Sequence, residues 1–276
     1  MVVTTCLSDC ACTRASACDT HDHRALQHLQ LMSHTVMSAA PSHVVPIAIH
    51  GAKGRMGMRI AACAEDDPGV RVVAAVDRSD ETGPERQPSV ASMLAKARVI
   101  IDFSSDEGTR EAVKHARTHG AGLIVGTTAL SPITLQALAE AEREIALMVC
   151  SNTSLGVAVT RRLAAEAARL LGPGYDVDVV EAHHTKKLDT PSGTALSLVA
   201  SLREGGREVT RDHVHAIRAG DVIGDHMVQF AGAGEIIRIQ HIATTRDLFA
   251  RGAIRAARWL FGKSAGRYRI EDTFGD

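Results

Sequence analysis

Aromatic residues are scarce in this sequence of 276 residues, which has one Trp, two Tyr and five Phe. Proteins that hold single-stranded nucleic acid stack successive bases on aromatic rings, so the composition argues against that class. An excess of charge of one sign is also lacking, because 31 Lys and Arg balance 32 Asp and Glu for a formal net charge of −1. No overall field therefore draws the chain to nucleic acid or to an anionic membrane surface.

Long hydrophobic runs are lacking as well. Even the longest apolar segments are short, such as IALMVC at 145–150. They fall far below the roughly 20 residues that a membrane-spanning helix needs. The N-terminal region has no continuous apolar segment of the kind found in signal peptides, and its three Asp residues are unlike a mitochondrial transit peptide. We therefore expect a cytoplasmic protein without a membrane span. At roughly 150 residues per domain, the length leaves room for one large domain or two modest ones.

The six cysteines do not form a recognisable disulfide framework. Four of them, Cys6, Cys10, Cys12 and Cys18, have the spacing C-x3-C-x-C-x5-C, which matches no familiar zinc motif. Cys63 and Cys150 stand far apart in apolar segments, where we interpret them as small buried side chains. We expect no metal, although histidines follow the N-terminal cysteines and leave that alternative open. We interpret residues 1–43 as an extension outside the fold, with Met37 as an alternative start.

From residue 44 onward, short β-branched runs alternate with segments of helical periodicity, which is typical of βαβ units around a parallel sheet. Apolar runs predict five strands, at 44–49, 70–76, 99–103, 122–126 and 145–150. Apolar stripes with a spacing of about 3.6 residues predict helices at 55–65, 107–119 and 132–144. The fold class is therefore α/β, with a Rossmann-like, parallel-sheet dinucleotide-binding domain over 44–153.

After residue 153 the pattern changes to one long helix followed by a strand and a second group of strands. The helix is predicted at 154–171, the strands at 175–184, 214–220, 226–232 and 235–243, and a further helix begins near Ser192. These elements predict a smaller α+β, substrate-binding domain over 154–245 with a mixed or antiparallel sheet. Apolar spacing over 247–261 predicts that the segment 246–276 forms a helix that returns to the dinucleotide-binding domain.

A glycine-rich turn, GAKGRMG, joins the first predicted strand to the first helix. There Gly51 permits a tight turn, Gly54 lets backbone N–H groups approach a pyrophosphate, and Gly57 allows the helix to pack closely on the sheet. Lys53 stands where the commonest fingerprint has its second glycine, so the motif alone is a weak match. Asp77 follows Gly57 by twenty residues, at the end of the second strand. An acid in that position accepts hydrogen bonds from an adenine ribose.

The residues near Asp77 do not favour one nicotinamide cofactor over the other. The Asp77 carboxylate repels a 2′-phosphate and favours NADH, whereas Arg78 and Lys53 can pair with that phosphate. We therefore expect the use of both NADH and NADPH. A glycine-rich turn followed by an Asp that caps a helix stays the structural alternative. Small and hydroxyl residues at 103–104, 126–128 and 151–153 end further strands at the carboxyl edge of the sheet, where such folds bind ligands.

The densest polar segment, EAHHTKKLDTPSGTAL at 181–196, carries the candidate chemistry. His183 and His184 end a strand and point to opposite faces if strand geometry persists, so one of them can face a cleft. Lys187 follows, and Ser192 leads into a helix whose free N–H groups suit a carboxylate. The structural alternative is a solvated strand end, surface lysines and a simple N-cap. A Ser/His/Asp hydrolase is disfavoured because the G-x-S-x-G motif is missing.

Six motifs in order resemble those of the dihydrodipicolinate (4-hydroxy-tetrahydrodipicolinate) reductase family of bacterial lysine and diaminopimelate synthesis. They are GAKGRMG, DFSS, VGTT, EAHHTKKLDTPSGTAL, IRAGDVIGDH and FARGAIRAARWL. The resemblance covers the chain from about residue 44 to the C-terminus. It implies an NAD(P)H-dependent reductase whose cyclic hydroxy imine dicarboxylate loses water, accepts hydride at ring C4 and is protonated. It also implies a homotetramer, assembled through the sheet of the second domain.

The resemblance also implies roles for single residues. His183 would be the acid/base and Lys187 the proton donor, which suits the titration behaviour of these side chains. His184, Ser192, Gly193 and Thr194 would bind the substrate. The cofactor would contact Gly51, Ala52, Lys53, Gly54, Arg55, Met56, Asp77, Arg78, Gly126, Thr127, Thr128, Cys150, Ser151, Asn152, Thr153 and Arg246. Thr153 departs from the family pattern, which often has Phe there.

Two other functions fit the same pattern of residues. One is a nicotinamide-dependent dehydrogenase acting on an amino or keto acid. The other is a non-catalytic dinucleotide sensor that uses its second domain to bind a partner.

Overall fold

The structure, a computed structural model, describes residues 43–77 and 95–275. The predicted extension lies outside these residues except for His43, and so do its four cysteines and the predicted cofactor residue Arg78. Within the described ranges, no helix has the length and apolar character needed to cross a bilayer.

The first sheet is parallel throughout, with the strand order β10-β5-β4-β3-β1-β2. Its strands are β1 Val45–His50, β2 Val70–Val76, β3 Val99–Asp102, β4 Gly122–Val125, β5 Ala146–Val149 and β10 Gly266–Tyr268. The five predicted strands are confirmed, but the predicted count is wrong because β10 adds a sixth. Its three residues show no apolar alternation, and pairing with β5 alone gives them strand geometry.

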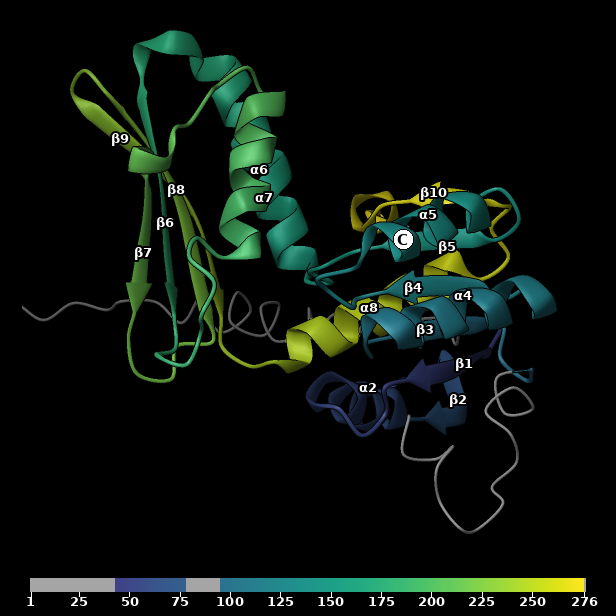
Figure 1. The fold of residues 1–276 in the computed structure, drawn as a ribbon. Coiled ribbons are helices and arrows are strands. Elements are labelled where there is room, and N and C mark those ends of the chain that lie inside the picture. The colour runs from purple at the N-terminus through teal and green to yellow at the C-terminus, as the bar shows by residue number, and fades with distance from the viewer. Residues whose placement is uncertain (1–42, 78–94, 276) are drawn as a thin grey trace, which may run out of the picture. The chain divides into compact units, whose positions relative to one another are not determined.

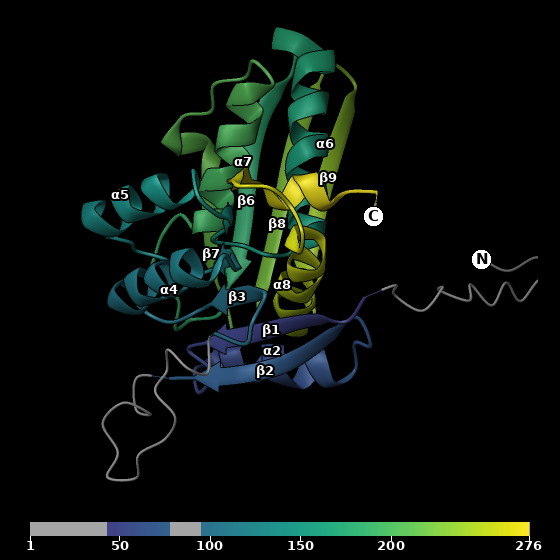
Figure 2. The same cartoon turned by 90° about the vertical axis from the view of Figure 1, so that its right-hand side faces the viewer.

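Helices cover both faces of this sheet, which explains why its inner strands are continuously apolar rather than alternating. On one face, α4 Asp106–His119 and α5 Pro132–Ala141 lie next to each other and pack through residues such as Val113 and Leu138 (Figure 2). On the other face, α2 Arg55–Glu65 and α8 Asp247–Leu260 contribute Ile60 and Ile254 to a second apolar cluster. The predicted buried position of Cys63 is confirmed in that cluster.

Side-chain caps and tertiary pairing set the ends of several of these helices. Ser105 begins α4 and Ser131 begins α5, each by accepting a hydrogen bond from a backbone N–H three residues later. Helix α5 ends at Ala141, three residues before its predicted end at 144. Glu144 instead forms a two-bond ion pair with Arg117 of α4, with distances of 2.6 and 3.0 Å.

The second sheet is mixed, as predicted, with the order β7-β6-β8-β9 and β7 parallel to β6. Figure 1 shows α6 and α7 side by side along one face of this sheet, where Val179, Leu198 and Phe230 are buried. The elements are α6 Leu155–Leu171, β6 Asp176–His183, α7 Gly193–Glu204, β7 Val214–Arg218, β8 Gly224–Gly232 and β9 Glu235–Ala243. The described residues also form short 3-10 helices at η2 Gly172–Gly174, η3 Arg211–His213 and η4 Ile270–Thr273.

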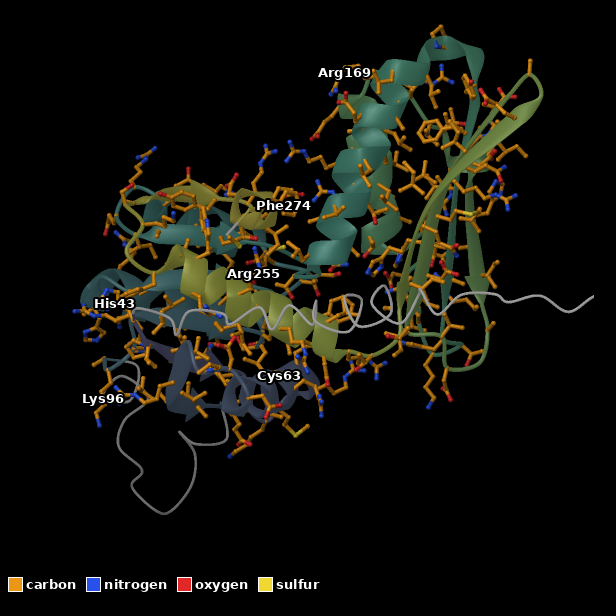
Figure 3. The ribbon with its side chains drawn as sticks, turned by 180° about the vertical axis from the view of Figure 1, so that it is seen from behind. His43, Cys63, Lys96, Arg169, Arg255 and Phe274 are labelled. Carbon is orange, nitrogen blue, oxygen red and sulfur yellow. The ribbon has the colours of Figure 1, made fainter. Side chains whose placement is uncertain are left out.

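The last helix, α8, packs on the first sheet and against α2. Asp247 at its start accepts two hydrogen bonds from Arg59 of α2, each 2.6 Å long. Arg255, marked in Figure 3 close to Phe274, donates to the carbonyl oxygen of Thr273 at 2.9 Å and so ties α8 to the C-terminal segment. The domain boundaries after residues 43, 153 and 245 stay predictions.

The closest backbone approach of α8 gives a stability prediction. A Cβ added at Gly252 would lie 1.8 Å from the carbonyl oxygen of Thr153, which is backbone and cannot turn away. Gly252→Ala should lower the free energy of unfolding by roughly 1–3 kcal/mol through overpacking. Gly174→Ala is the matched control, because nothing lies within 4 Å of its added Cβ, and it should change stability by less than about 0.5 kcal/mol. Urea unfolding measures both, and equal midpoints would contradict the described packing.

Candidate active site

The three glycines of the first turn occupy their positions for different structural reasons. Gly51 has a φ of +83°, and a Cβ there would lie 2.4 Å from the carbonyl oxygen of Phe103. A Cβ at Gly57 would lie 2.2 Å from the carbonyl oxygen of Gly51. The atom nearest to a Cβ at Gly54 is 3.1 Å away, and Gly54 lines an open cleft. The outer two glycines are therefore required by the backbone, whereas the middle one leaves room for a ligand.

The start of α2 fits the diphosphate of a dinucleotide. Its N-cap, Gly54, has no side chain to accept hydrogen bonds from the first-turn N–H groups, and that turn contains no acidic residue. Such N–H groups bind an anion readily. The Oδ2 atom of Asp77 accepts a hydrogen bond from the Lys53 N–H at 3.1 Å, which ties the end of β2 to the turn. The donor set therefore suits a nicotinamide dinucleotide.

A cleft of about 640 Å³ lies over the carboxyl ends of the first-sheet strands and the end of β6. Four of the predicted substrate and catalytic residues line it: His183, His184, Lys187 and Thr194. Ten predicted cofactor residues line it: Gly54, Arg55, Met56, Gly126, Thr127, Thr128, Ser151, Asn152, Thr153 and Arg246. The structure therefore brings the two predicted groups to one cavity.

Among the residues that the structure describes, the other predicted site residues do not line this cleft. Gly51, Ala52, Lys53 and Asp77 form the turn beside it and the strand end next to that turn. Cys150 packs against the core, and its thiol donates to the carbonyl oxygen of Asn152 at 2.7 Å. Ser192 is 1% exposed and caps α7, and Gly193 is the first residue of that helix.

Five lining residues were absent from the predicted site: Phe103, Ser104, Ser105, Ile223 and Phe249. Phe103 and Ser104 stand at a strand end that was predicted to lie at the ligand edge, whereas Ile223 and Phe249 belong to two of the motifs that carry the resemblance, IRAGDVIGDH and FARGAIRAARWL, but were given no role in the site. The Phe103 ring lies over Gly126, where an added Cβ would come within 2.2 Å of it. The Thr153 hydroxyl donates to the Phe249 carbonyl oxygen at 2.7 Å. Phe249 thus lies beside position 153 at the cleft.

A buried carboxylate, Asp102, holds the loops on the dinucleotide side. It is fully buried and accepts hydrogen bonds from the hydroxyl groups of Thr109 at 2.6 Å and Thr127 at 2.8 Å. It is also bonded to Ser104 and, at 2.9 Å, to Nδ1 of His50. Because Ser104 and Thr127 line the cleft, Asp102 fixes two of its wall segments from beneath.

Both histidines of the pair line the cleft, which differs from the expectation that only one would face it. Strand β6 ends at His183, so the alternation of strand side chains does not extend to His184. His183 is 7% exposed, and its Nδ1 atom is hydrogen-bonded to Glu181, which is fully buried. Arg218 of β7 donates to both Glu181 oxygens, at 2.8 and 3.1 Å.

The charges around His183 act in opposite directions on its pKa. Burial lowers the pKa of His183, and the Glu181 carboxylate opposes that effect. Burial would raise the pKa of Glu181, but hydrogen bonds from Arg218 and His183 outweigh it and lower the pKa. His226 of β8 meets the His183 ring edge-on at 4.9 Å between centroids, and burial lowers the pKa of His226 to about 4. Glu181 is therefore an ionised acceptor beside imidazoles that favour the neutral form.

Polar groups suited to a carboxylate surround the start of α7. The Asn152 amide donates to the Thr194 hydroxyl at 2.9 Å, and Lys187 forms an ion pair with Asp189 at 2.9 Å. Nδ1 of His184 is buried and has no hydrogen-bond partner among residues 43–77 and 95–275. A cation, a hydroxyl group and an unpartnered imidazole nitrogen thus converge near a helix N-terminus, which favours an anionic ligand.

A parallel dinucleotide-binding sheet whose ligand edge shares a cleft with a histidine and a lysine defines a nicotinamide-dependent oxidoreductase. The family model described as dihydrodipicolinate reductase, N-terminus, matches residues 45–153. The model described as dihydrodipicolinate reductase, C-terminus, matches residues 156–274. The chain belongs to the dihydrodipicolinate reductase family.

Similar proteins carry the corresponding name. The 4-hydroxy-tetrahydrodipicolinate reductase of Stenotrophomonas maltophilia is 45% identical, over 82% of this chain and 96% of that protein. The protein of the same name from Alkalilimnicola ehrlichii is 40% identical, over 83% of this chain and 98% of its own length. The structure of dipicolinate-bound dihydrodipicolinate reductase from Paenisporosarcina sp. TG-14 has a TM-score of 0.68 at 21% identity. That alignment covers 83% of this chain and 99% of the other. The last similarity concerns the fold alone.

The turn geometry predicts separate effects at neighbouring glycines. Gly54→Val keeps an ordinary backbone conformation but places a side chain where N–H groups must approach a diphosphate. We expect the Kd for NADH to rise at least roughly tenfold, about 1.4 kcal/mol, while the unfolding midpoint falls less than in Gly51→Ala, because the nearest atom to a Cβ at Gly54 is 3.1 Å away rather than 2.4 Å. Gly51→Ala should instead lower the unfolding midpoint, because Gly51 has a positive φ and an added Cβ would collide with the Phe103 backbone. Fluorescence titration with NADH and thermal unfolding measure these effects, and unchanged NADH affinity of Gly54→Val would contradict the assignment.

Proposed function

We propose that the chain catalyses the NAD(P)H-dependent reduction of 4-hydroxy-tetrahydrodipicolinate to tetrahydrodipicolinate, with loss of water, in lysine and diaminopimelate biosynthesis. The observation that carries this proposal is the single cleft that contains His183, His184 and Lys187 together with the ligand edge of the dinucleotide-binding sheet. Membership of the dihydrodipicolinate reductase family supports the same substrate.

The bound nicotinamide would supply the hydride that reaches ring C4 of the substrate. His183 and Lys187 would move protons: the His183 imidazole, whose pKa burial lowers, would accept a proton in its neutral form, and the Lys187 ammonium beside the substrate carboxylates would deliver one. His184 and Thr194 would hold substrate carboxylate oxygens near the start of α7, with the backbone of Ser192 and Gly193 shaping that end of the helix. These roles account for a buried, unpartnered His184 nitrogen in a polar wall.

The cofactor would lie along the first-sheet side of the cleft. Its diphosphate would meet the N–H groups from Gly54 to Met56, and its adenine ribose would meet Asp77. The nicotinamide end would extend past Gly126 toward Asn152 and Arg246, and Phe103 and Phe249 line the cleft on this route. The remaining predicted cofactor residues that the structure describes would support this path from the turn and the strand ends.

We further propose a cytoplasmic homotetramer. The face of the second sheet opposite α6 and α7 carries exposed apolar side chains, among them Ile217, Ile236 and Ile242, which are 49%, 57% and 57% exposed. Exposed apolar residues grouped on one sheet face favour association with another copy.

The function is tested by a spectrophotometric assay in which a purified synthase supplies the unstable hydroxy imine. We expect nicotinamide oxidation only when the synthase product is present. The competing dehydrogenase function predicts no oxidation above background with that product and clear oxidation with a keto acid and ammonia.

Two substitutions separate catalysis from cofactor binding. His183→Gln and Lys187→Ala should each lower kcat at least roughly a hundredfold, because each removes a group that transfers or holds a proton in the transition state. NADH affinity should change little, since neither residue belongs to the dinucleotide turn. Steady-state kinetics and NADH titration check both, and unchanged kcat in both variants would favour the non-catalytic sensor.

The use of both cofactors is a separate prediction. The ratio of kcat/KM for NADH and NADPH should stay below about a thousand, which corresponds to roughly 4 kcal/mol. Asp77→Asn keeps an acceptor for the Lys53 N–H but removes the charge that repels a 2′-phosphate, so the relative efficiency with NADPH should rise roughly tenfold. A larger ratio in the parent, or no change in the variant, would contradict the assignment of Asp77.

A further inference from the structure

Glu181 receives hydrogen bonds from three separate elements of the second domain. Nδ1 of His183 lies on the same strand, and Arg218 of β7 donates to both carboxylate oxygens, at 2.8 and 3.1 Å. The backbone N–H of Ser192, the N-cap of α7, donates to Oε1 at 3.2 Å. The carboxylate has no exposed surface and touches neither a cofactor residue nor the cleft.

We propose that Glu181 is the positioning residue of His183, holding the imidazole in one tautomer with Nε2 presented to the cleft. This inference rests on the proposed acid/base role of His183. An ionised carboxylate only accepts hydrogen bonds, so the nitrogen that faces Glu181 must carry the ring proton. The other ring nitrogen, Nε2, is then the one that accepts or releases a proton on the cleft side.

The surroundings of the His183 ring limit its orientation. His226 packs edge-on against it with an angle of 72° between the ring planes. A Cβ at Gly224 would lie 3.3 Å from Nε2, so the glycine leaves this edge of the ring uncovered. Glu181 supplies the direction, and the packed His226 ring restricts rotation away from it.

Arg218 links the Glu181 carboxylate to the loop on the substrate side of the cleft. Besides Glu181, its guanidinium donates to the carbonyl oxygen of Asp189 at 2.7 Å and to the Thr190 hydroxyl at 3.1 Å. Those two residues belong to the segment that runs from Lys187 to the start of α7. One buried ion pair therefore sets both the direction of the acid/base and the placement of the loop that carries the proposed proton donor.

The test uses Glu181→Gln, which keeps the shape of the side chain and an acceptor oxygen but removes the charge. Because Gln can also donate, it no longer imposes one tautomer on His183. We expect kcat to fall at least roughly thirtyfold, with the Kd for NADH within about twofold of the parent. Full kcat in a folded Glu181→Gln variant would overturn the proposal.

A double-mutant cycle separates positioning from general structural support. If Glu181 acts through His183, then Glu181→Gln in the His183→Gln background should change kcat less than about threefold. If the two substitutions lower kcat independently, so that their fold-changes multiply, the proposal is overturned. Full kcat of His183→Gln alone would instead contradict the proposed acid/base role, so the two failures are distinguishable.

The pH dependence of kcat gives a second readout. The charged and titratable groups that act on His183 are Glu181, Lys187, Arg218 and His226. Of these, Glu181 raises the pKa of His183, whereas Lys187 and Arg218 lower it. Loss of the Glu181 charge should therefore move the His183 pKa in the kcat profile to lower pH. An unmoved profile together with a reduced kcat would identify a merely structural role.

Two further variants keep the test decisive. Glu181→Gln alone leaves Arg218 as a partly buried cation without its carboxylate partner, so Glu181→Gln/Arg218→Gln removes both charges together and should fold. We expect this double variant to be at least as slow as Glu181→Gln, because it also loses the Arg218 hydrogen bonds to Asp189 and Thr190, and parent activity in it would overturn the proposal. Asp178→Asn is the matched control. Asp178 lies on the same strand and binds His213 and His215 at 3.1 and 2.8 Å outside the cleft, so kcat should stay unchanged.

Discussion

A carboxylate removed from water must have its oxygens satisfied by donors, or its burial costs several kcal/mol. Two such carboxylates stand behind the cleft, and the side chains that satisfy them also build its walls. On the dinucleotide side, Asp102 accepts hydrogen bonds from the hydroxyl groups of Ser104 and Thr127. On the substrate side, Glu181 accepts hydrogen bonds from the His183 imidazole and the Arg218 guanidinium. The need to pair each buried charge thus gives both walls a fixed geometry before any ligand binds.

The two sides of the cleft suit different ligands, for reasons that lie in the backbone. Parallel strands end at one edge, and the uncapped start of α2 supplies N–H groups there without a competing acid. On the other side, β6 ends where its last residue, His183, reaches the cleft, and α7 begins ten residues later, at Gly193, with its own N-terminus. In the proposed function, a hydride donor and an anionic acceptor would therefore meet between two sets of electropositive backbone ends.

Most of the fold follows from local patterns, but parts of the site depend on pairing that no local pattern encodes. The apolar runs predicted the first five strands, and the HH-x-x-K string located the cleft residues His183 and Lys187. Glu181 and His183 are two residues apart on one strand face, a signal that could have indicated their contact. Arg218 could not be found this way, because only the β6–β7 register places it opposite His183. Strand β10 was missed for the same reason, since tertiary pairing alone defines it.

We propose above all that one cleft holds the nicotinamide against an anionic ring that is bound by His183, His184 and Lys187. A crystal structure with NADH and pyridine-2,6-dicarboxylate, a planar analogue of the substrate, tests it most directly. We expect nicotinamide C4 within roughly 3–3.5 Å of the analogue ring, the analogue carboxylates at the start of α7, and Nε2 of His183 facing the ring. An analogue bound elsewhere, or His183 and Lys187 turned away from the nicotinamide, would contradict the claim.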